Sequence, residues 1–142
     1  MVIKYLGDTS EGDFPLIEIP YFLNKVRVGW PSPADDYVER SIDLNEHLIK
    51  NPAATYFVRV SGNSMINAYI GDGAILVVDR SIEPQHKCIV VAAISGSYAC
   101  KRLLVKPRLC LASENPKYPP ILIGKNEELE IAGVVIAAIN TY

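Results

Sequence analysis

Apolar residues from position 55 onward occur in short runs, and turn-forming residues separate the runs. The runs are rich in Val, Ile, Tyr and Phe, and Gly, Pro, Asn, Asp or Ser residues lie between them, which predicts β-strands. Strands are predicted at residues 56–60, 74–78, 88–94, 98–105, 108–112, 121–123 and 129–139. Short strands joined by turns favour a mainly β fold in which most neighbouring strands are antiparallel.

The N-terminal part of the chain has a different pattern. Residues 1–28 contain two glycines, two prolines and one short apolar segment, at 16–19, so we expect an extended arm. Two prolines in the segment 29–34 forbid helix and hold the residues before them extended, which marks a boundary. We therefore predict an arm at residues 1–28 and a single domain with one core at residues 29–142.

One short helix is predicted between this boundary and the first strand. Asp43 precedes the segment 44–49, and Glu46 follows it by three residues. An acidic cap with a glutamate three residues later is close to a capping box.

Composition limits the functions that the chain can have. Its 142 residues carry 14 Lys and Arg against 16 Asp and Glu, a net charge of −2, so direct sequence-specific DNA binding is not expected. It has neither a secretory signal pattern nor an apolar stretch of about 20 residues, which predicts a cytoplasmic protein without a membrane segment. The three cysteines, Cys88, Cys100 and Cys110, lack metal-site spacing. We expect reduced thiols, no metal and no cofactor.

Ser64 and Lys101 are the candidate catalytic residues. Ser64 ends a glycine-containing turn directly after a predicted strand, although such a segment is usually only a turn. Lys101 lies in an apolar strand, and alternation places it on the buried face if Arg102 points to water. Burial lowers the pKa of a lysine, and a neutral amine can accept the proton of a serine hydroxyl. His47 and His86 lie in no motif that suggests a catalytic base, so a Ser-His-Asp triad is not expected.

Several segments together carry a family resemblance. They are Ser-Gly-Asn-Ser-Met at 61–65, Ile-Gly-Asp-Gly at 70–73, Val-Val-Asp at 77–79 and Lys101. With them the chain resembles the LexA-type self-cleaving serine peptidases. The segment Gly-Trp-Pro-Ser-Pro-Ala-Asp-Asp-Tyr-Val-Glu at 29–39 is similar to the UmuD-like branch of that family, the SOS mutagenesis proteins.

The resemblance implies a LexA/UmuD-like catalytic domain that cuts its own chain between Val28 and Gly29. Ser64 would be the nucleophile and Lys101 the general base, and the backbone N–H groups of Ser64 and Met65 would hold the oxyanion. It also implies that RecA filaments on single-stranded DNA promote the cut. The product beginning at Gly29 would form a homodimer and serve as accessory subunit of a UmuC-like Y-family polymerase in translesion synthesis.

Other interpretations remain open at this point. The first is a polymerase-binding module with the same fold that does not cut itself, because Val28 is bulkier than the small residue usual before the cut in this family. A LexA-type repressor would need a helical DNA-binding domain, for which 28 arm residues are too few. A signal peptidase, which also uses a Ser-Lys dyad, would need a membrane segment.

Overall fold

The computed structural model describes residues 3–8, 18–22 and 38–142, with side chains at Ile3 and from Asp43 onward. The chain forms two compact units, one of residues 1–11 and 51–142 and the other of residues 12–50. The boundary predicted between residues 28 and 29 lies outside the described residues.

The smaller unit contains one hairpin-like strand pair and one helix. Strand β2 (Glu18–Phe22) pairs antiparallel with β3 (Val38–Asp43), and helix α1 (Leu44–Leu48) follows at once. The Asp43 side chain accepts a hydrogen bond from the Glu46 backbone N–H at 3.0 Å, which satisfies one of the free donors of the first turn. The predicted helix and its acidic cap are therefore confirmed.

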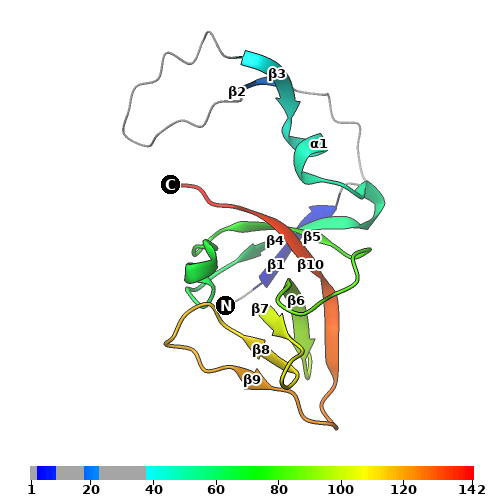
Figure 1. Ribbon diagram of the computed structural model, residues 1–142, viewed down its shortest axis with the longest axis vertical. Coiled ribbons are helices and arrows are strands. Elements are labelled where there is room, and N and C mark those ends of the chain that lie inside the picture. Colours follow the sequence, from blue (N-terminus) through cyan, green and yellow to red (C-terminus); the bar gives the residue numbers. More distant parts are fainter. Residues whose placement is uncertain (1–2, 9–17, 23–37) are drawn as a thin grey trace. The chain divides into compact units, whose positions relative to one another are not determined.

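The larger unit is one eight-stranded sheet with the order β1-β4-β5-β10-β6-β7-β8-β9 (Figure 1). Every neighbouring pair is antiparallel. The strands are β1 (Ile3–Asp8), β4 (Thr55–Val60), β5 (Ile75–Asp79), β6 (Ile89–Ile94), β7 (Ser97–Leu104), β8 (Cys110–Ala112), β9 (Ile121–Leu122) and β10 (Leu129–Ile139). Two short 3-10 helices, η2 (Pro52–Ala54) and η3 (Ile66–Ala68), flank β4. The mainly antiparallel β fold is confirmed.

Strand β10 is the longest strand and lies in the middle of the sheet, between β5 and β6. Its first part pairs with β6 and its second part with β5, and each ladder has a register shift (Figure 1). Gly133 pairs with Val91 of β6 and directly precedes Val134, which pairs with both neighbouring strands. A Cβ at Gly133 would stand 2.5 Å from the Val78 Cγ1. Only glycine allows this close approach of β10 to β5.

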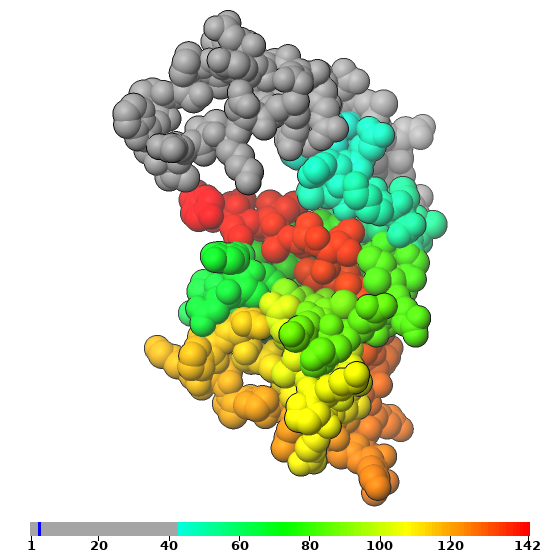
Figure 2. All heavy atoms as spheres, viewed as in Figure 1, coloured from blue at the N-terminus to red at the C-terminus, as the bar shows by residue number. Residues whose placement is uncertain are grey.

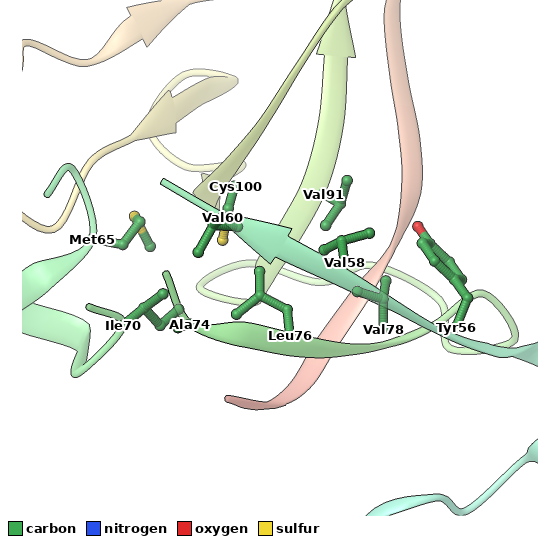
Figure 3. Close-up of a cluster of buried hydrophobic side chains, with 10 residues drawn as sticks. All are labelled: Tyr56, Val58, Val60, Met65, Ile70, Ala74, Leu76, Val78, Val91 and Cys100. Carbon is green, nitrogen blue, oxygen red and sulfur yellow. The ribbon is translucent and has the colours of Figure 1, made fainter. Parts of the chain in front are cut away.

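The two faces of the sheet carry separate apolar clusters. Strand β6 is buried on both faces, because Val91 belongs to one cluster and Val90 to the other. The first cluster gathers side chains from several strands and from the loop after β4, as Figure 3 shows: Tyr56, Val58, Val60, Met65, Ile70, Ala74, Leu76, Val78, Val91 and Cys100.

None of the described helices has the length and apolar character that a membrane crossing requires.

Candidate active site

The loop between β4 and β5 carries Ser64 and is closed at its base. Val60 donates to the Ala74 carbonyl at 3.0 Å and accepts from the Gly73 N–H at 2.8 Å. Within the loop, the Gly62 N–H donates to the Asp72 carboxylate at 2.7 Å. Gly62 has a φ of 93°, a conformation that residues with a Cβ rarely adopt. These contacts fix the turn that leads into Ser64.

The Ser64 side chain is buried at the end of this turn. It is 1% exposed, and its neighbour Met65 packs into the first apolar cluster (Figure 3). The Ser64 Oγ has no hydrogen-bond partner among the described residues. A buried hydroxyl without a partner costs about 1–3 kcal/mol, and such groups are frequent at functional sites.

Lys101 lies on β7 and is buried, 7% exposed. It is paired in register with Val90 and shares its face of the strand with Leu103, and both belong to the second apolar cluster. Arg102 points to the other face, where its guanidinium pairs with the Glu114 carboxylate and donates to the Lys87 carbonyl at 2.6 Å. The expected alternation of the two basic residues is therefore observed, although Arg102 is half-buried and paired.

The Lys101 amine has one hydrogen-bond partner in the described part of the chain. Its Nζ donates to the Ser113 Oγ at 2.7 Å and lies 5.7 Å from the centre of the Tyr118 ring. Desolvation by burial lowers the pKa of Lys101, against a smaller opposing effect of the Cys100 thiol. Burial also raises the pKa of Cys100 to about 12, so this thiol stays protonated. Lys101 is thus held nearer to its neutral form than an exposed lysine.

A short segment after β8 connects the surroundings of Lys101 to the turn of Ser64. Ser113 binds the Lys101 amine, and two residues later the Asn115 side chain donates to the Asn63 carbonyl at 2.9 Å. The Asn67 N–H donates to the Glu114 carbonyl, also at 2.9 Å. Figure 2 shows the loop after β4, in green, directly beside the yellow and orange segment that follows β8. The fold thus places both predicted residues beside one segment, but no hydrogen bond joins Ser64 to Lys101.

The backbone around Ser64 offers donors for an anion. In the described part of the chain, the N–H groups of Ser64 and Met65 donate to no protein acceptor. Two free N–H groups next to a serine hydroxyl are the arrangement that stabilises the oxyanion of an acyl-transfer reaction.

The described part of the larger unit includes two hollows with defined linings, and one of them borders the candidate site. The nearer, of about 360 Å³, is lined by Asn67, Ser113, Glu114, Asn115, Pro116, Tyr118, Pro119 and Pro120. The other, of about 740 Å³, is lined by Ile3, Tyr56, Val58, Arg80, Val91, Tyr98, Glu130, Ile131 and Ala132, and neither Ser64 nor Lys101 reaches it. The smaller hollow is therefore the relevant one, because Ser113 links it to Lys101.

Three residues near the candidate site were not predicted from the sequence: Ser113, Asn115 and Tyr118. The only signal for Ser113 is the pairing register, in which Arg102 opposes Ala112, so that Lys101 and Ser113 come next to each other. Ser113 lies one residue beyond the end of both the predicted strand at 108–112 and β8, so the strand prediction alone did not single it out.

The remaining sequence predictions concern other side chains. His47 and His86 are both exposed, and the His86 Nδ1 accepts from the Val105 N–H at 3.0 Å. The three cysteines are free thiols, with Cys100 and Cys110 buried and Cys88 half-buried. Over the described residues, no group of three or more His, Cys, Asp or Glu is placed to hold a metal ion. Val28 and Gly29 lie outside the described residues.

Comparisons with known proteins assign a family to most of the chain. The model of the peptidase S24-like family matches residues 20–136. The chain is 45% identical over 127 residues to protein MucA of Salmonella typhimurium, covering 89% of this chain and 87% of the relative. It is 44% identical over 121 residues to protein SamA of Salmonella typhimurium strain LT2, covering 85% and 84%. The LexA repressor of Bordetella avium is 33% identical over 121 residues, covering 84% of this chain and 56% of the repressor.

Proposed function

The chain belongs to the peptidase S24-like family, and on this premise we propose that it is a serine peptidase that cuts its own N-terminal arm with a Ser64–Lys101 dyad. The family resemblance inferred from the sequence is confirmed by the family match and by the LexA repressor among the relatives. The dyad and the cut between Val28 and Gly29 are the proposal.

The observation that carries the proposal is the setting of the two side chains. Lys101 is buried against apolar neighbours and has a lowered pKa, and the Ser64 hydroxyl, whose turn is bonded to the segment that contacts Lys101, is buried without a partner. Neither state stabilises the fold, since a buried amine and an unpaired hydroxyl both cost free energy. Both are what a base and its nucleophile require.

The chemistry follows the acyl-enzyme route. Neutral Lys101 takes the proton of the Ser64 hydroxyl as the Oγ bonds to the carbonyl carbon of Val28. The N–H groups of Ser64 and Met65 hold the oxyanion. The amine then gives its proton to the nitrogen of Gly29 as the C–N bond breaks, and water hydrolyses the ester to free Ser64. Because substrate and catalyst are one molecule, proximity supplies several kcal/mol of the required activation.

The biological role proposed is that of a cytoplasmic SOS mutagenesis protein. The likeness to MucA, SamA and ImpA, which are UmuD-like, supports this role. In this proposal RecA filaments on single-stranded DNA promote the cut. The product is a homodimer that binds a UmuC-like polymerase during translesion synthesis.

A second function is favoured by one observation, the hydrogen bond from Lys101 to Ser113 instead of to Ser64. A chain in which this arrangement is permanent would be a polymerase-binding module with the same fold that does not cut itself.

Intact mass against time separates the two functions. The purified chain, Ser64→Ala and Lys101→Ala are incubated at neutral and alkaline pH, with and without RecA, single-stranded DNA and nucleotide. The peptidase predicts that only the unsubstituted chain loses residues 1–28, and faster at alkaline pH, where Lys101 is deprotonated. If that chain stays whole under every condition, the binding module is the better description.

A further inference from the structure

One short segment, residues 113–115, contacts both the Lys101 amine and the turn of Ser64. The Ser113 Oγ accepts from the Lys101 Nζ at 2.7 Å. The Ser64 Oγ has no partner among the described residues. A change of partner by the amine, from Ser113 to Ser64, would satisfy the buried Ser64 hydroxyl. It would leave Ser113, which is half-buried, facing the hollow that it lines.

We propose that Ser113 is a positioning residue that holds the Lys101 amine in a latent arrangement, and that self-cleavage begins when the amine exchanges Ser113 for Ser64. The inference rests on the proposed peptidase function. It assigns a role to a residue outside the proposed dyad.

The structure makes the lysine the moving part of this exchange. Ser113 follows β8 and opposes Lys101 across the β7–β8 ladder. Its segment is tied to the turn of Ser64 by the bond from Asn115 to the Asn63 carbonyl. Both hydroxyls are therefore fixed to one framework, whereas the lysine side chain can change rotamer within the site.

The charge of the amine decides which partner it prefers. A hydroxyl that accepts from an ammonium stabilises the charged form, and the charged form cannot act as a base. By this argument the bond to Ser113 favours the charged amine, whereas desolvation by burial lowers the pKa of Lys101. The other titratable or charged groups around the amine are Cys100, which is protonated, the Tyr118 phenol, and the Arg102–Glu114 ion pair. None of these groups is a carboxylate free to replace Ser113.

The test is the pH profile of self-cleavage in Ser113→Ala, measured on the full chain without activator. We expect the midpoint to move to lower pH and the rate at neutral pH to rise roughly tenfold, which corresponds to about one pH unit. Ser113→Thr keeps the hydroxyl and should keep the parent profile. The matched control is Ser97→Ala, which removes an exposed serine from β7, the strand that carries Lys101.

The outcome that overturns the proposal is a Ser113→Ala profile with an unchanged midpoint, or a slower reaction at neutral pH. The first would mean that Ser113 does not hold the amine, and the second that it assists the base. Adding Ser64→Ala to Ser113→Ala must abolish the cut.

An NMR titration of the Lys101 side chain keeps the proposal testable if no variant cuts itself. In Ser64→Ala, which removes the reaction, Ser113→Ala should lower the Lys101 titration midpoint by about one pH unit and Ser113→Thr should not. An unchanged midpoint would reject the role of Ser113. A lowered midpoint without any cleavage in the parent would reject the peptidase and leave the Ser113 contact in place.

Discussion

The Asn115 side-chain amide donates to the backbone carbonyl of Asn63, the residue before Ser64, at 2.9 Å. This bond joins two loops that four strands of the chain, β5 to β8, separate in sequence. The same Asn115 side chain accepts from the Lys117 N–H at 3.0 Å, so it orders its own turn as well. One side chain thus joins the turn of Ser64 to the segment that contacts Lys101.

Removing this bond should reduce self-cleavage more than it reduces the stability of the fold. We expect Asn115→Ala to cost about 1 kcal/mol in free energy of unfolding and to slow self-cleavage by roughly tenfold or more. Urea unfolding and the mass assay measure the two effects. Asn126→Ala, at an exposed turn position, is the control and should change neither the stability nor the cleavage rate. If both variants cut themselves at the same rate, the Asn115 bond has no part in the site.

Replacing Lys101 by an apolar side chain should stabilise the protein while it abolishes the cut. The folded-state pKa of Lys101 lies below its ordinary value of 10.5, so the unfolded chain binds this proton more tightly. The stability of the parent therefore rises with pH from the folded pKa to about 10.5. Lys101→Met should raise the free energy of unfolding by roughly 1 kcal/mol at neutral pH, and it should remove the increase of stability with pH. Unfolding curves measured at several pH values test this. Lys125→Met, at an exposed position, is the control and should keep the pH dependence of stability seen in the parent.

Asp79 should control stability in acid. This buried carboxyl accepts from Asn51 at 2.8 Å and from the Ser81 hydroxyl at 2.6 Å. Burial raises its pKa, but these bonds and further N–H donors outweigh burial and hold the pKa below its ordinary value of 3.8. Its contribution is thus complete above 3.8 and disappears as pH falls through the lower folded pKa.

Asp79→Asn should therefore cost about 2 kcal/mol at neutral pH and progressively less in acid below 3.8. Urea unfolding at neutral and acidic pH measures the difference between variant and parent. Glu83→Gln, at an exposed acid, is the control. A penalty for Asp79→Asn that stayed the same at both pH values would contradict the assigned pKa direction.

Gly62 should matter for both stability and chemistry. At its φ of 93° a Cβ costs about 1–2 kcal/mol, so Gly62→Ala should lower the free energy of unfolding by that amount. The strained turn would also displace Ser64, and self-cleavage should fall by more than the stability loss predicts. Gly124→Ala is the control, since its Cβ would meet only the Glu127 side chain at an ordinary 3.5 Å. Similar cleavage rates in the two variants would count against the role of Gly62.

The strands predicted from the sequence are those whose apolar pattern is strong. All seven runs after residue 55 became β4 to β10, with boundaries shifted by a few residues at most. Ser95 and Gly96 form the two-residue loop between β6 and β7, and both have the positive φ of a type I′ turn, for which glycine is well suited. Local sequence determines these features.

The strands that were missed depend on distant partners. Strand β1 mixes polar and apolar residues and forms only by pairing with β4, more than 40 residues further along the chain. Strand β2 contains Pro20, which reduces the strand signal. The partner of Lys101 was missed for a similar reason, because serine after a strand usually indicates a turn and only the ladder places Ser113 opposite the amine.

The pairing of β1 with β4 and of β2 with β3 has a consequence for the products of the proposed cut. β1 and β2 precede the bond between Val28 and Gly29, whereas β4 and β3 follow it. Hydrolysis would turn the arm from a covalent part of the chain into a bound peptide ligand with its own dissociation constant. Dilution and competing strands, not the peptidase, would then determine when the two products separate.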